Sequence, residues 1–527
     1  MQINNSIDPV KGIGTAYEGV VRVPKPGGVK KGWQPQYVVV CDFKLFLYDC
    51  TLDRAGKPAE ISPSVSNVLD MKDDEFSVTS VQDSDVIHAN KRDVPCIFRL
   101  ATSQIHRTSS DIDPSYYGSQ SSSTSDPAKC YTLLMVDNVN EKNKWVIALN
   151  ELHRLLRKNN KFPQRKAFEL KELLDNQSLP LIRGALSAAV IDKDRIALAT
   201  EEGLFCIELD REIVVRVGDN KRVEMVEYVA AEQLLIVLAG KEKQLKLIPV
   251  SALDGRELKW IKMEGTKQCH TFCFGSVNQA TSNYICVAVK KMVIVYEINR
   301  TTLRHKKLKE LAMPGLPQCL SILNGRLCVG YPSGFRMWSF HDNAQQPLLN
   351  LEDSSLQFIN NATYDAHFLI ETSPDKEYLL IFQKFGLYVD SYGKRSRSHE
   401  LMFPTLPLHF AYSAPYLSVF CQSHVDVFNV STAEWVQTLN IKMAKPLTKD
   451  GSLSLCYISE SPFVVVLNDL LSDENVINIP LLQTNVKGPA ARLQPARKKR
   501  KYSFKILKDE DRNARPNSMR RVSYPEY

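Results

Sequence analysis

Four basic side chains surround a turn rich in proline and glycine close to the N-terminus: Arg22, Lys25, Lys30 and Lys31. Residues 24–28 read Pro-Lys-Pro-Gly-Gly, which predicts a loop between two strands. Cationic side chains on an open loop attract phosphate groups or an anionic membrane, at about 1 kcal/mol for each charge near the surface. These residues are therefore candidates for contact with inositol phosphates or an anionic membrane.

Two other segments contain residue types that occur in catalytic or metal sites. Residues 287–290 read Val-Ala-Val-Lys, as in the lysine strand of protein kinases, but the chain has no glycine-rich phosphate loop, His-Arg-Asp loop or Asp-Phe-Gly motif. Residues 269–273 read Cys-His-Thr-Phe-Cys, and these ligands would lie along one strand without a second pair nearby, unlike a structural zinc site. We therefore expect no enzymatic activity in this chain, no metal site and no cofactor.

The net charge of +8 comes entirely from the C-terminal tail. Residues 488–527 contain 12 basic and 4 acidic residues, so the preceding part of the chain is electrically neutral. A neutral folded part lacks the net-basic surface that phosphate neutralisation requires, so we expect no nucleic-acid binding. The tail includes the basic run 497–501 and two candidate phosphorylation sites, Ser503 and Ser523. A phosphate there would remove up to about 2 charges.

The loop and the tail need a folded frame, and the first 160 residues predict one β-rich domain. Seven short strands are predicted, at Tyr17–Val23, Gln36–Cys41, Lys44–Tyr48, Val65–Met71, Phe76–Val81, Ile97–Ala101 and Tyr131–Val136. A serine-rich insert, residues 103–129, separates the last two and is predicted to be disordered. Apolar residues at helical spacing, beginning with Trp145, then predict one helix from Glu141 to Lys158.

Pairs of apolar strands recur through the rest of the chain. They begin at Arg195, Leu234, Tyr284, Arg326, Tyr378 and Tyr416, and a seventh run spans Leu453 to Leu467. The first six starts are 38 to 52 residues apart, the period of a β-propeller blade. We therefore predict seven blades. Two separate β-sandwiches are the alternative, but they would not predict an even period. The Gly-His and Trp-Asp dipeptides that are typical of WD repeats are missing, so we do not expect a standard WD propeller.

The order of seven strands and a closing helix with Trp145 resembles a pleckstrin-homology (PH) domain. More narrowly, residues 14–19 (Gly-Thr-Ala-Tyr-Glu-Gly), 30–33 (Lys-Lys-Gly-Trp) and 41–49 (Cys-Asp-Phe-Lys-Leu-Phe-Leu-Tyr-Asp) resemble the PH domain of the myotonic-dystrophy-kinase-related kinases, the MRCK and Genghis Khan type. Residues 201–205 (Glu-Glu-Gly-Leu-Phe) and 414–419 (Ala-Pro-Tyr-Leu-Ser-Val) are similar to the citron-homology (CNH) propeller of that family.

The resemblance implies a mainly β chain with a PH barrel at 14–160, a linker at 161–178, a CNH propeller at 179–470 and a disordered basic tail at 471–527, after a short N-terminal linker at 1–13. The family's tight phosphoinositide binders carry Arg or Lys-x-Arg on the second strand, whereas residues 34–37 here read Gln-Pro-Gln-Tyr. The resemblance implies one possible ligand site, the loop between the first two strands, and this difference implies weak binding of anionic lipid there. A structural or protein-binding PH domain is the alternative.

By resemblance, the chain is a C-terminal fragment or short form of a Ser/Thr kinase that regulates actin and myosin downstream of Rho-family GTPases. The propeller would bind such a small GTPase or a cytoskeletal protein. A citron-type scaffold without kinase activity is the alternative, and a Rho exchange factor is a third. No apolar stretch is long enough for a membrane helix, the first residues do not resemble a signal peptide, and the 12 cysteines are scattered. We therefore expect a cytoplasmic chain, peripheral to the membrane or cell cortex.

Overall fold

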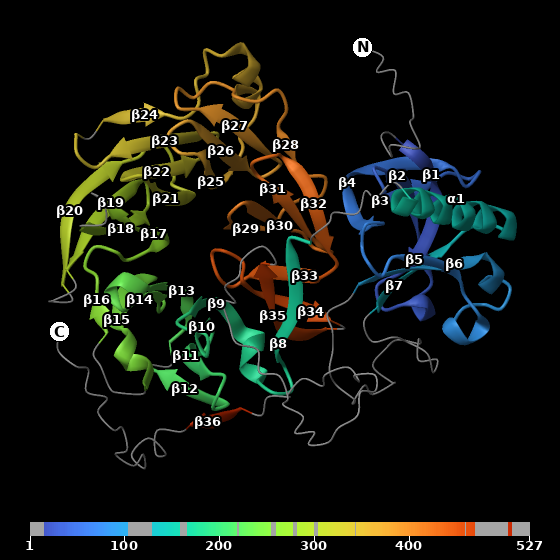
Figure 1. Ribbon diagram of the computed structural model, residues 1–527, viewed down its shortest axis with the longest axis horizontal. Helices are drawn as coiled ribbons and strands as arrows, with labels where there is room; N and C mark the ends of the chain where they lie inside the picture. The colour runs from blue at the N-terminus through green and yellow to red at the C-terminus, as the bar shows by residue number, and fades with distance from the viewer. Residues whose placement is uncertain are drawn as a thin grey trace, which may run out of the picture.

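Two folded units lie side by side in the computed structural model, a small barrel and a ring of blades (Figure 1). The structure describes residues 15–103, 129–158, 166–218, 221–254, 260–277, 282–299, 304–342, 344–458, 460–469 and 504–507. No helix in these ranges is long and apolar enough to cross a membrane.

The N-terminal domain is the predicted sheet of seven antiparallel strands with one helix. The strands are β1 (Thr15–Pro24), β2 (Trp33–Cys41), β3 (Lys44–Leu52), β4 (Pro58–Asp70), β5 (Ser77–Ser80), β6 (Ile97–Ser103) and β7 (Lys129–Met135). They are ordered β4-β3-β2-β1-β7-β6-β5. Asp42 and Phe43 both have positive φ, as a two-residue hairpin between β2 and β3 requires.

The helix α1 (Val139–Lys158) packs one apolar face against this sheet. Its buried residues include Trp145, Leu149, Leu152 and Leu156, spaced three and four apart. The Trp145 ring lies edge-on to Tyr17, with 4.5 Å between ring centroids. A Cβ at Gly19 would lie 3.2 Å from the Trp145 ring, so glycine at this position in β1 lets the helix approach the sheet. The core confirms the PH-like arrangement predicted from the sequence.

The larger unit is the predicted seven-bladed propeller, with four antiparallel strands in each blade. Blades 1 to 3 are β9 (Ala185–Val190), β10 (Arg195–Thr200), β11 (Gly203–Glu208), β12 (Ile213–Val217); β13 (Val223–Val229), β14 (Leu234–Ala239), β15 (Gln244–Pro249), β16 (Ile261–Lys262); and β17 (Cys269–Val277), β18 (Ser282–Val289), β19 (Met292–Asn299), β20 (Arg304–Ala312).

Blades 4 to 7 complete the ring. Their strands are β21 (Cys319–Leu323), β22 (Arg326–Tyr331), β23 (Gly334–Ser339), β24 (Gln345–Pro347); β25 (Ala366–Ser373), β26 (Glu377–Phe382), β27 (Phe385–Asp390), β28 (Leu401–Met402); β29 (His409–Ser413), β30 (Tyr416–Phe420), β31 (Val425–Asn429), β32 (Glu434–Leu439); and β33 (Lys442–Pro446), β34 (Leu453–Ile458), β35 (Ser461–Asp469), β8 (Phe168–Asp175).

The predicted strand pairs are the middle two strands of each blade. Every residue of β11 and of β14 is buried, because the blades on either side cover both faces of the sheet. Such strands read as continuous apolar runs and not as alternating patterns. Hydrophobic clusters fill the spaces between neighbouring blades, for example between blades 1 and 2 and between blades 4 and 5.

The strand β8 corrects the linker expected at residues 161–178. Residues 168–175 are instead the outer strand of blade 7, in which Leu174 pairs with Val464 and Phe168 with Asp469. Leu and Glu favour a helix locally, but the unpaired edge of β35 provides hydrogen-bond partners and buries Leu173 and Leu174. The propeller is thus closed by a strand that precedes its first blade in sequence.

The C-terminal tail also differs from the expectation of disorder throughout 471–527. The strand β36 (Lys505–Leu507) pairs in parallel with β12, with Ile506 opposite Val214. Phe504 packs against the cluster between blades 7 and 1. This short apolar segment extends the open edge of blade 1. It is difficult to recognise in the sequence because basic residues dominate the composition of the tail.

The two domains contact each other through blade 6. The Ser423 hydroxyl, in the turn between β30 and β31, donates to the backbone oxygen of Ser66 in β4 at 2.9 Å. Trp435 in β32 lies edge-on to Phe46 in β3, with 6.0 Å between centroids. In Figure 1, β3 and β4 lie on the side of the barrel that faces β32. The PH-like domain is therefore held in one orientation against the ring.

Candidate functional site

The β1–β2 loop presents the predicted lysines on an internally hydrogen-bonded backbone. The Lys25 amide donates to the Gly32 carbonyl at 2.9 Å, and the Gly28 amide donates to the Lys25 carbonyl at 2.9 Å. Gly27, Gly28 and Gly32 have φ near +90°, a conformation that other residues rarely adopt. The side chains of Lys25, Lys30 and Lys31 are exposed. A fixed loop loses little conformational entropy when it binds an anion.

Arg22 lies at the end of β1 but differs from the three lysines. Its Nη1 is 2.6 Å from the Asp137 carboxylate, just before α1. This ion pair neutralises the guanidinium locally and directs it toward the helix. The structure therefore brings three of the four predicted cations together on the loop and pairs the fourth with an acidic residue.

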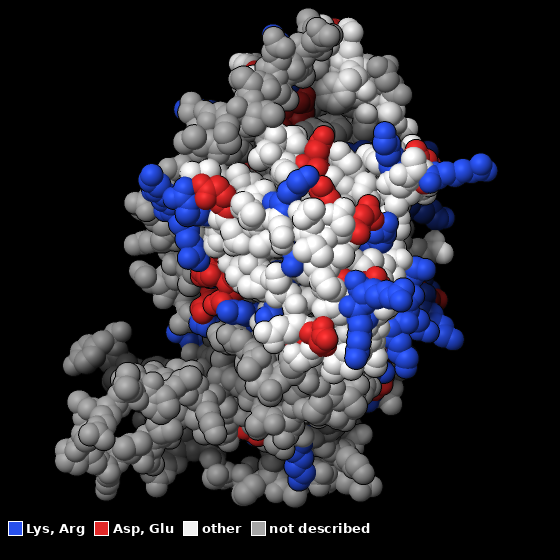
Figure 2. All heavy atoms as spheres, turned by 90° about the vertical axis from the view of Figure 1, so that its right-hand side faces the viewer, with Lys and Arg blue, Asp and Glu red and all other residues white. Residues whose placement is uncertain are grey.

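The face of the molecule on the PH-like side is unevenly charged. Figure 2 shows Lys and Arg side chains gathered mainly along the margins of this face, whereas its centre is largely uncharged with scattered groups of both signs. An anionic surface would thus interact with the margins of the domain more strongly than with its centre.

The kinase-like and zinc-like segments are parts of blade 3. Residues Val287 to Val289 lie in β18, and Lys290 is exposed in the turn that follows, with φ of 53°. Cys269 packs between blades 2 and 3, but Cys273 packs between blades 3 and 4, because a bulge in β17 lies between them. Burial raises the pKa of the Cys269 thiol to about 12. The two cysteines are packing residues on opposite faces.

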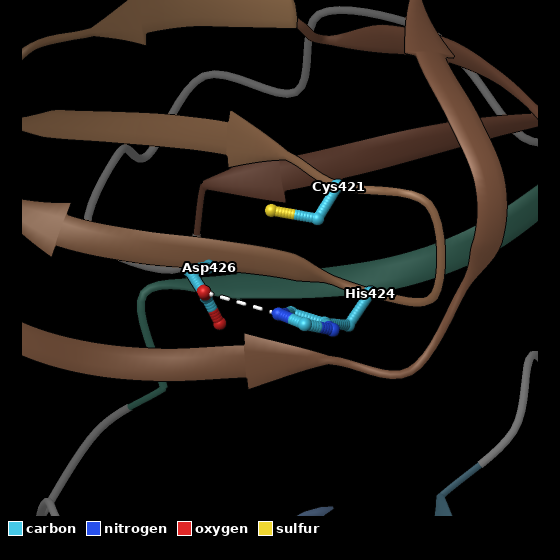
Figure 3. Close-up of side chains that lie close together, drawn as sticks. All are labelled: Cys421, His424 and Asp426. Atoms are coloured by element: carbon cyan, nitrogen blue, oxygen red, sulfur yellow. Dashed lines mark hydrogen bonds and ion pairs between the residues drawn. The ribbon is translucent and has the colours of Figure 1, made fainter. Parts of the chain in front are cut away.

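A second group of metal-ligating residue types, which the sequence analysis did not single out, occurs in blade 6. Ligand atoms of Cys421, His424 and Asp426 lie within 4.8 Å of one another, and all three residues are buried (Figure 3). The spacing Cys-x-x-His-x-Asp at a strand turn is a signal that could have found it. The hydrogen bonds of His424 and Asp426 within the blade indicate another role.

His424 and Asp426 form a buried polar network that reaches the domain interface. His424 Nε2 is 3.2 Å from the Asp426 carboxylate, which also accepts from the Thr438 hydroxyl at 3.0 Å. His424 Nδ1 is 2.8 Å from the Ser423 hydroxyl. The same hydroxyl donates its hydrogen to the Ser66 carbonyl. The network orients the turn that contacts the PH-like domain.

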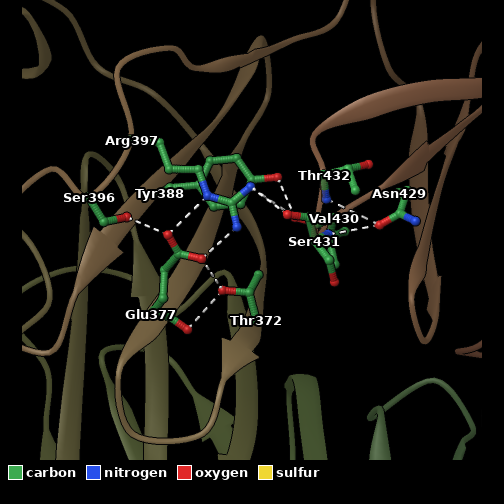
Figure 4. A network of polar contacts seen from close by, with 9 residues as sticks. All are labelled: Thr372, Glu377, Tyr388, Ser396, Arg397, Asn429, Val430, Ser431 and Thr432. Carbon is green, nitrogen blue, oxygen red and sulfur yellow. Dashed lines mark hydrogen bonds and ion pairs between the residues drawn. The ribbon is translucent and has the colours of Figure 1, made fainter.

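A second polar network joins blade 5 to blade 6. Arg397 donates to the Glu377 carboxylate at 2.6 and 3.0 Å, and its guanidinium lies 3.8 Å from the Tyr388 ring centroid (Figure 4). Arg397 and Tyr388 also donate to backbone oxygens of Ser431 and Val430, at 3.0 and 2.8 Å. The guanidinium of Arg397 is therefore already bound by a carboxylate, an aromatic ring and a backbone oxygen. We interpret this network as a support of the ring and not as a binding site.

The remaining predicted sites lie in the tail. Ser503, Ser523 and the basic run 497–501 are outside the described residues.

Comparisons with known proteins divide the chain in the same way as the fold. Residues 8–155 match the family model described as the MRCK kinase PH domain, and residues 192–450 match the CNH domain model. One solved structure, the AfRom2 CNH domain, is 22% identical with a TM-score of 0.49, covering 57% of this chain and 99% of that chain.

Curated relatives match nearly the whole chain. Serine/threonine-protein kinase mrck-1 of Caenorhabditis elegans is 45% identical over 96% of this chain and 32% of its own length. Serine/threonine-protein kinase MRCK alpha of Homo sapiens is 41% identical over 98% of this chain and 28% of its own length. Serine/threonine-protein kinase Genghis Khan of Drosophila melanogaster is 42% identical over 88% of this chain and 28% of its own length. The chain therefore spans about a third or less of the relatives it matches.

Proposed function

This chain belongs to the MRCK family through its PH domain and its CNH domain, and we propose that it is the membrane-targeting and protein-interaction region of a Ser/Thr kinase of that family. The PH domain would bring the kinase to the membrane or cell cortex. The propeller would hold a protein partner. By family membership, the pathway would be regulation of actin and myosin downstream of a Rho-family GTPase.

The observation that carries this proposal is the exposed triad Lys25, Lys30 and Lys31 on a hydrogen-bonded loop. Each charge near an anionic surface contributes about 1 kcal/mol, so three charges support reversible binding of modest affinity. The second strand supplies no further cation, since Gln36 there is buried and its amide donates to Asp49 and Ser66. Weak, salt-sensitive attachment to anionic lipid follows.

The propeller supports the second half of the proposal. A closed ring has few exposed strand edges, so its rims and turns are the surfaces that remain for partners. The PH domain covers part of blade 6 through Ser66 and Phe46. Because the two domains are in contact, a partner on the ring and a membrane beside the PH domain would be held in a defined relative position.

The experiment is co-sedimentation of the full chain with vesicles of phosphatidylcholine alone or mixed with phosphatidylserine or phosphoinositide. We expect binding to the anionic vesicles, and the variant Lys25→Ala/Lys30→Ala/Lys31→Ala should lose most of it. A control with the same loss of charge is Arg54→Ala/Lys57→Ala/Lys91→Ala, which removes three exposed cations elsewhere in the same domain. Equal loss in both variants would contradict a specific loop site, and binding that ignores salt would contradict the electrostatic mechanism.

A further inference from the structure

A pocket of about 450 Å³ lies where blades 6, 7 and 1 meet. Its wall includes the first residues of two inner strands, Ala185 of β9 and His409 of β29, together with Lys445 of β33. The turns that contain Glu201 and Gln422 complete it. The pocket therefore lies at a rim of the ring, and Gln422 immediately precedes Ser423, which contacts the PH domain.

The polar side of the pocket carries more positive than negative charge. Lys445 is half-buried, and its ammonium group donates to the Ala185 carbonyl at 2.8 Å. The acidic group Glu201 is already paired with Arg222 at 3.0 Å. Arg183 is exposed, and among the described residues it has no ion-pair partner. Two cations thus line the pocket, and the one carboxylate in its lining, Glu201, is shared with Arg222.

Burial is the main electrostatic effect on two groups of the pocket. Burial lowers the pKa of Lys445, the charge of Glu201 opposes this change, and the charge of Arg222 adds to it to a smaller degree. Burial also lowers the pKa of His409, with added contributions from Lys445 and His367. A desolvated cation such as Lys445 favours an anionic ligand, which would restore part of the solvation that the ammonium group has lost.

Apolar side chains that are open to solvent also line the pocket. Met443 is 58% exposed and Leu408 is 48% exposed, and both line the cavity together with Tyr457. Large apolar side chains in a concave site beside a few polar groups are typical of surfaces that bind a ligand. An inorganic anion or a lipid phosphate would use the cations but would leave this apolar side in water.

We propose that this pocket binds an acidic peptide segment of a partner protein. A carboxylate of the segment would lie between Arg183 and Lys445, and an adjacent apolar side chain would pack against Leu408 and Met443. The proposal deepens the proposed function and rests on it, because it assigns the protein-interaction role of the propeller to one surface and one partner chemistry.

The test measures binding of fluorescent peptide pools to the full chain. In one pool, Asp and Glu alternate with Leu and Phe; in the matched pool, Asn and Gln replace the acids. We expect saturable, salt-sensitive binding of the acidic pool alone. Arg183→Glu and Met443→Asp should each weaken it roughly tenfold or more, since one reverses a cation and the other places an acid on the apolar side.

Both substitutions alter exposed residues, so the fold should be retained, and thermal melting verifies this. Lys262→Glu and Met402→Asp are matched controls at exposed positions on outer strands β16 and β28 and should bind as the wild type does. Equal binding of the Asn/Gln pool, displacement by inorganic phosphate alone, or wild-type affinity in both pocket variants would overturn the proposal.

A further comparison separates this proposal from the general function. If a partner captured by the wild-type chain is retained equally by Arg183→Glu and Met443→Asp, the pocket is not the docking site, although the propeller still binds a partner. If both variants lose that partner and the acidic pool together, the pocket is the site. Vesicle binding through the PH loop should be the same in all of these variants.

Discussion

The ammonium nitrogen of Lys44 in the PH domain lies 4.5 Å from the ring centroid of Trp435 in blade 6 of the propeller. Lys44 is 1% exposed, and its nearest carboxylates are Asp70 at 3.8 Å and Asp42 at 3.9 Å. A buried lysine is costly unless its charge is compensated, and the indole face and Asp70 provide that compensation together. The contact makes the relative position of the two domains a property of the fold.

Replacing Trp435 with alanine should loosen the domain contact. The variant loses the indole that covers Lys44 and the edge-on contact with Phe46, so water reaches a cation that was buried. We expect faster hydrogen exchange in β3 and β4 and a larger radius of gyration by small-angle scattering. The melting temperature of the propeller should also fall, because Trp435 packs against Phe428 and donates to the Gln437 carbonyl within blade 6.

The matched control is Trp260→Ala, which removes a lysine–tryptophan contact inside blade 2, where Lys246 lies 4.9 Å from the ring centroid. That variant should leave the scattering profile and the exchange in β3 unchanged. A compact wild-type profile for Trp435→Ala would show that the Ser423–Ser66 hydrogen bond and its neighbours suffice to hold the domains together.

Weakening β8 should destabilise the entire propeller and not a local linker. Leu173 and Leu174 are 3% and 2% exposed, and β8 provides the backbone partners of β35. Leu174→Ala should cost about 2–5 kcal/mol of unfolding free energy, the range for a buried leucine. Chemical denaturation of the propeller measures this. Glu169→Ala, at an exposed residue of the same strand, is the control, and equal stability of the two variants would contradict the closure.

The role of β8 shows where reasoning from the sequence succeeds and where it fails. The middle strands of the blades were predictable because burial on both faces produces long apolar runs, as in β14. The strand β8 was interpreted as a linker because its partner, β35, is nearly 300 residues away in sequence. The intrinsic helix or strand propensity of residues 168–175 contains no information about a pairing partner that is so distant in sequence.

The candidate sites also differ in how far the sequence alone could predict them. The loop lysines could be found from their types and from the glycines around them, but the pairing of Arg22 with Asp137 depends on the helix position. The pocket at Arg183, His409 and Lys445 combines residues from three blades. Arg183 is more than 200 residues from the other two in sequence, and His409 and Lys445 lie in different blades, so no local pattern joins them.

The stability of the chain should fall as the pH drops below about 6.5. Burial lowers the pKa of four histidines: His153 in α1, His305 in blade 3, His367 in blade 5 and His409 in blade 6. In the unfolded chain these groups bind protons from about pH 6.5 downward, while the folded chain resists protonation until lower pH. The unfolded state therefore binds more protons in this window, so stability rises with pH through it.

Urea denaturation at about pH 7.5 and about pH 5.5 tests this prediction, above the range in which ordinary carboxylates titrate. The unfolding midpoint should be lower at the acidic pH. His367→Gln/His409→Gln should reduce the pH dependence, because two of the four groups no longer titrate. A midpoint that is the same at both pH values, or an unchanged slope in the double variant, would contradict the role of buried histidines.

The basic run at residues 497–501 should contribute more to binding of anionic membranes at low salt than the PH loop does. The run carries five charges, the loop presents three exposed lysines, and the rest of the chain has no net charge. At about 1 kcal/mol for each charge near the surface, the larger group dominates if both reach the membrane. Only charges within a screening length of about 8 Å at physiological salt contribute, so the advantage should shrink as salt rises.

The variant replaces Arg497, Lys498, Lys499, Arg500 and Lys501 with serine and keeps Lys505–Leu507, because deletion of the tail would also remove β36 from blade 1. Co-sedimentation with phosphatidylserine vesicles over a salt series, beside the triple lysine variant of the loop, measures the two contributions. If the serine variant binds like the wild type at every salt concentration, the run stays in solvent and the PH loop alone attaches the chain.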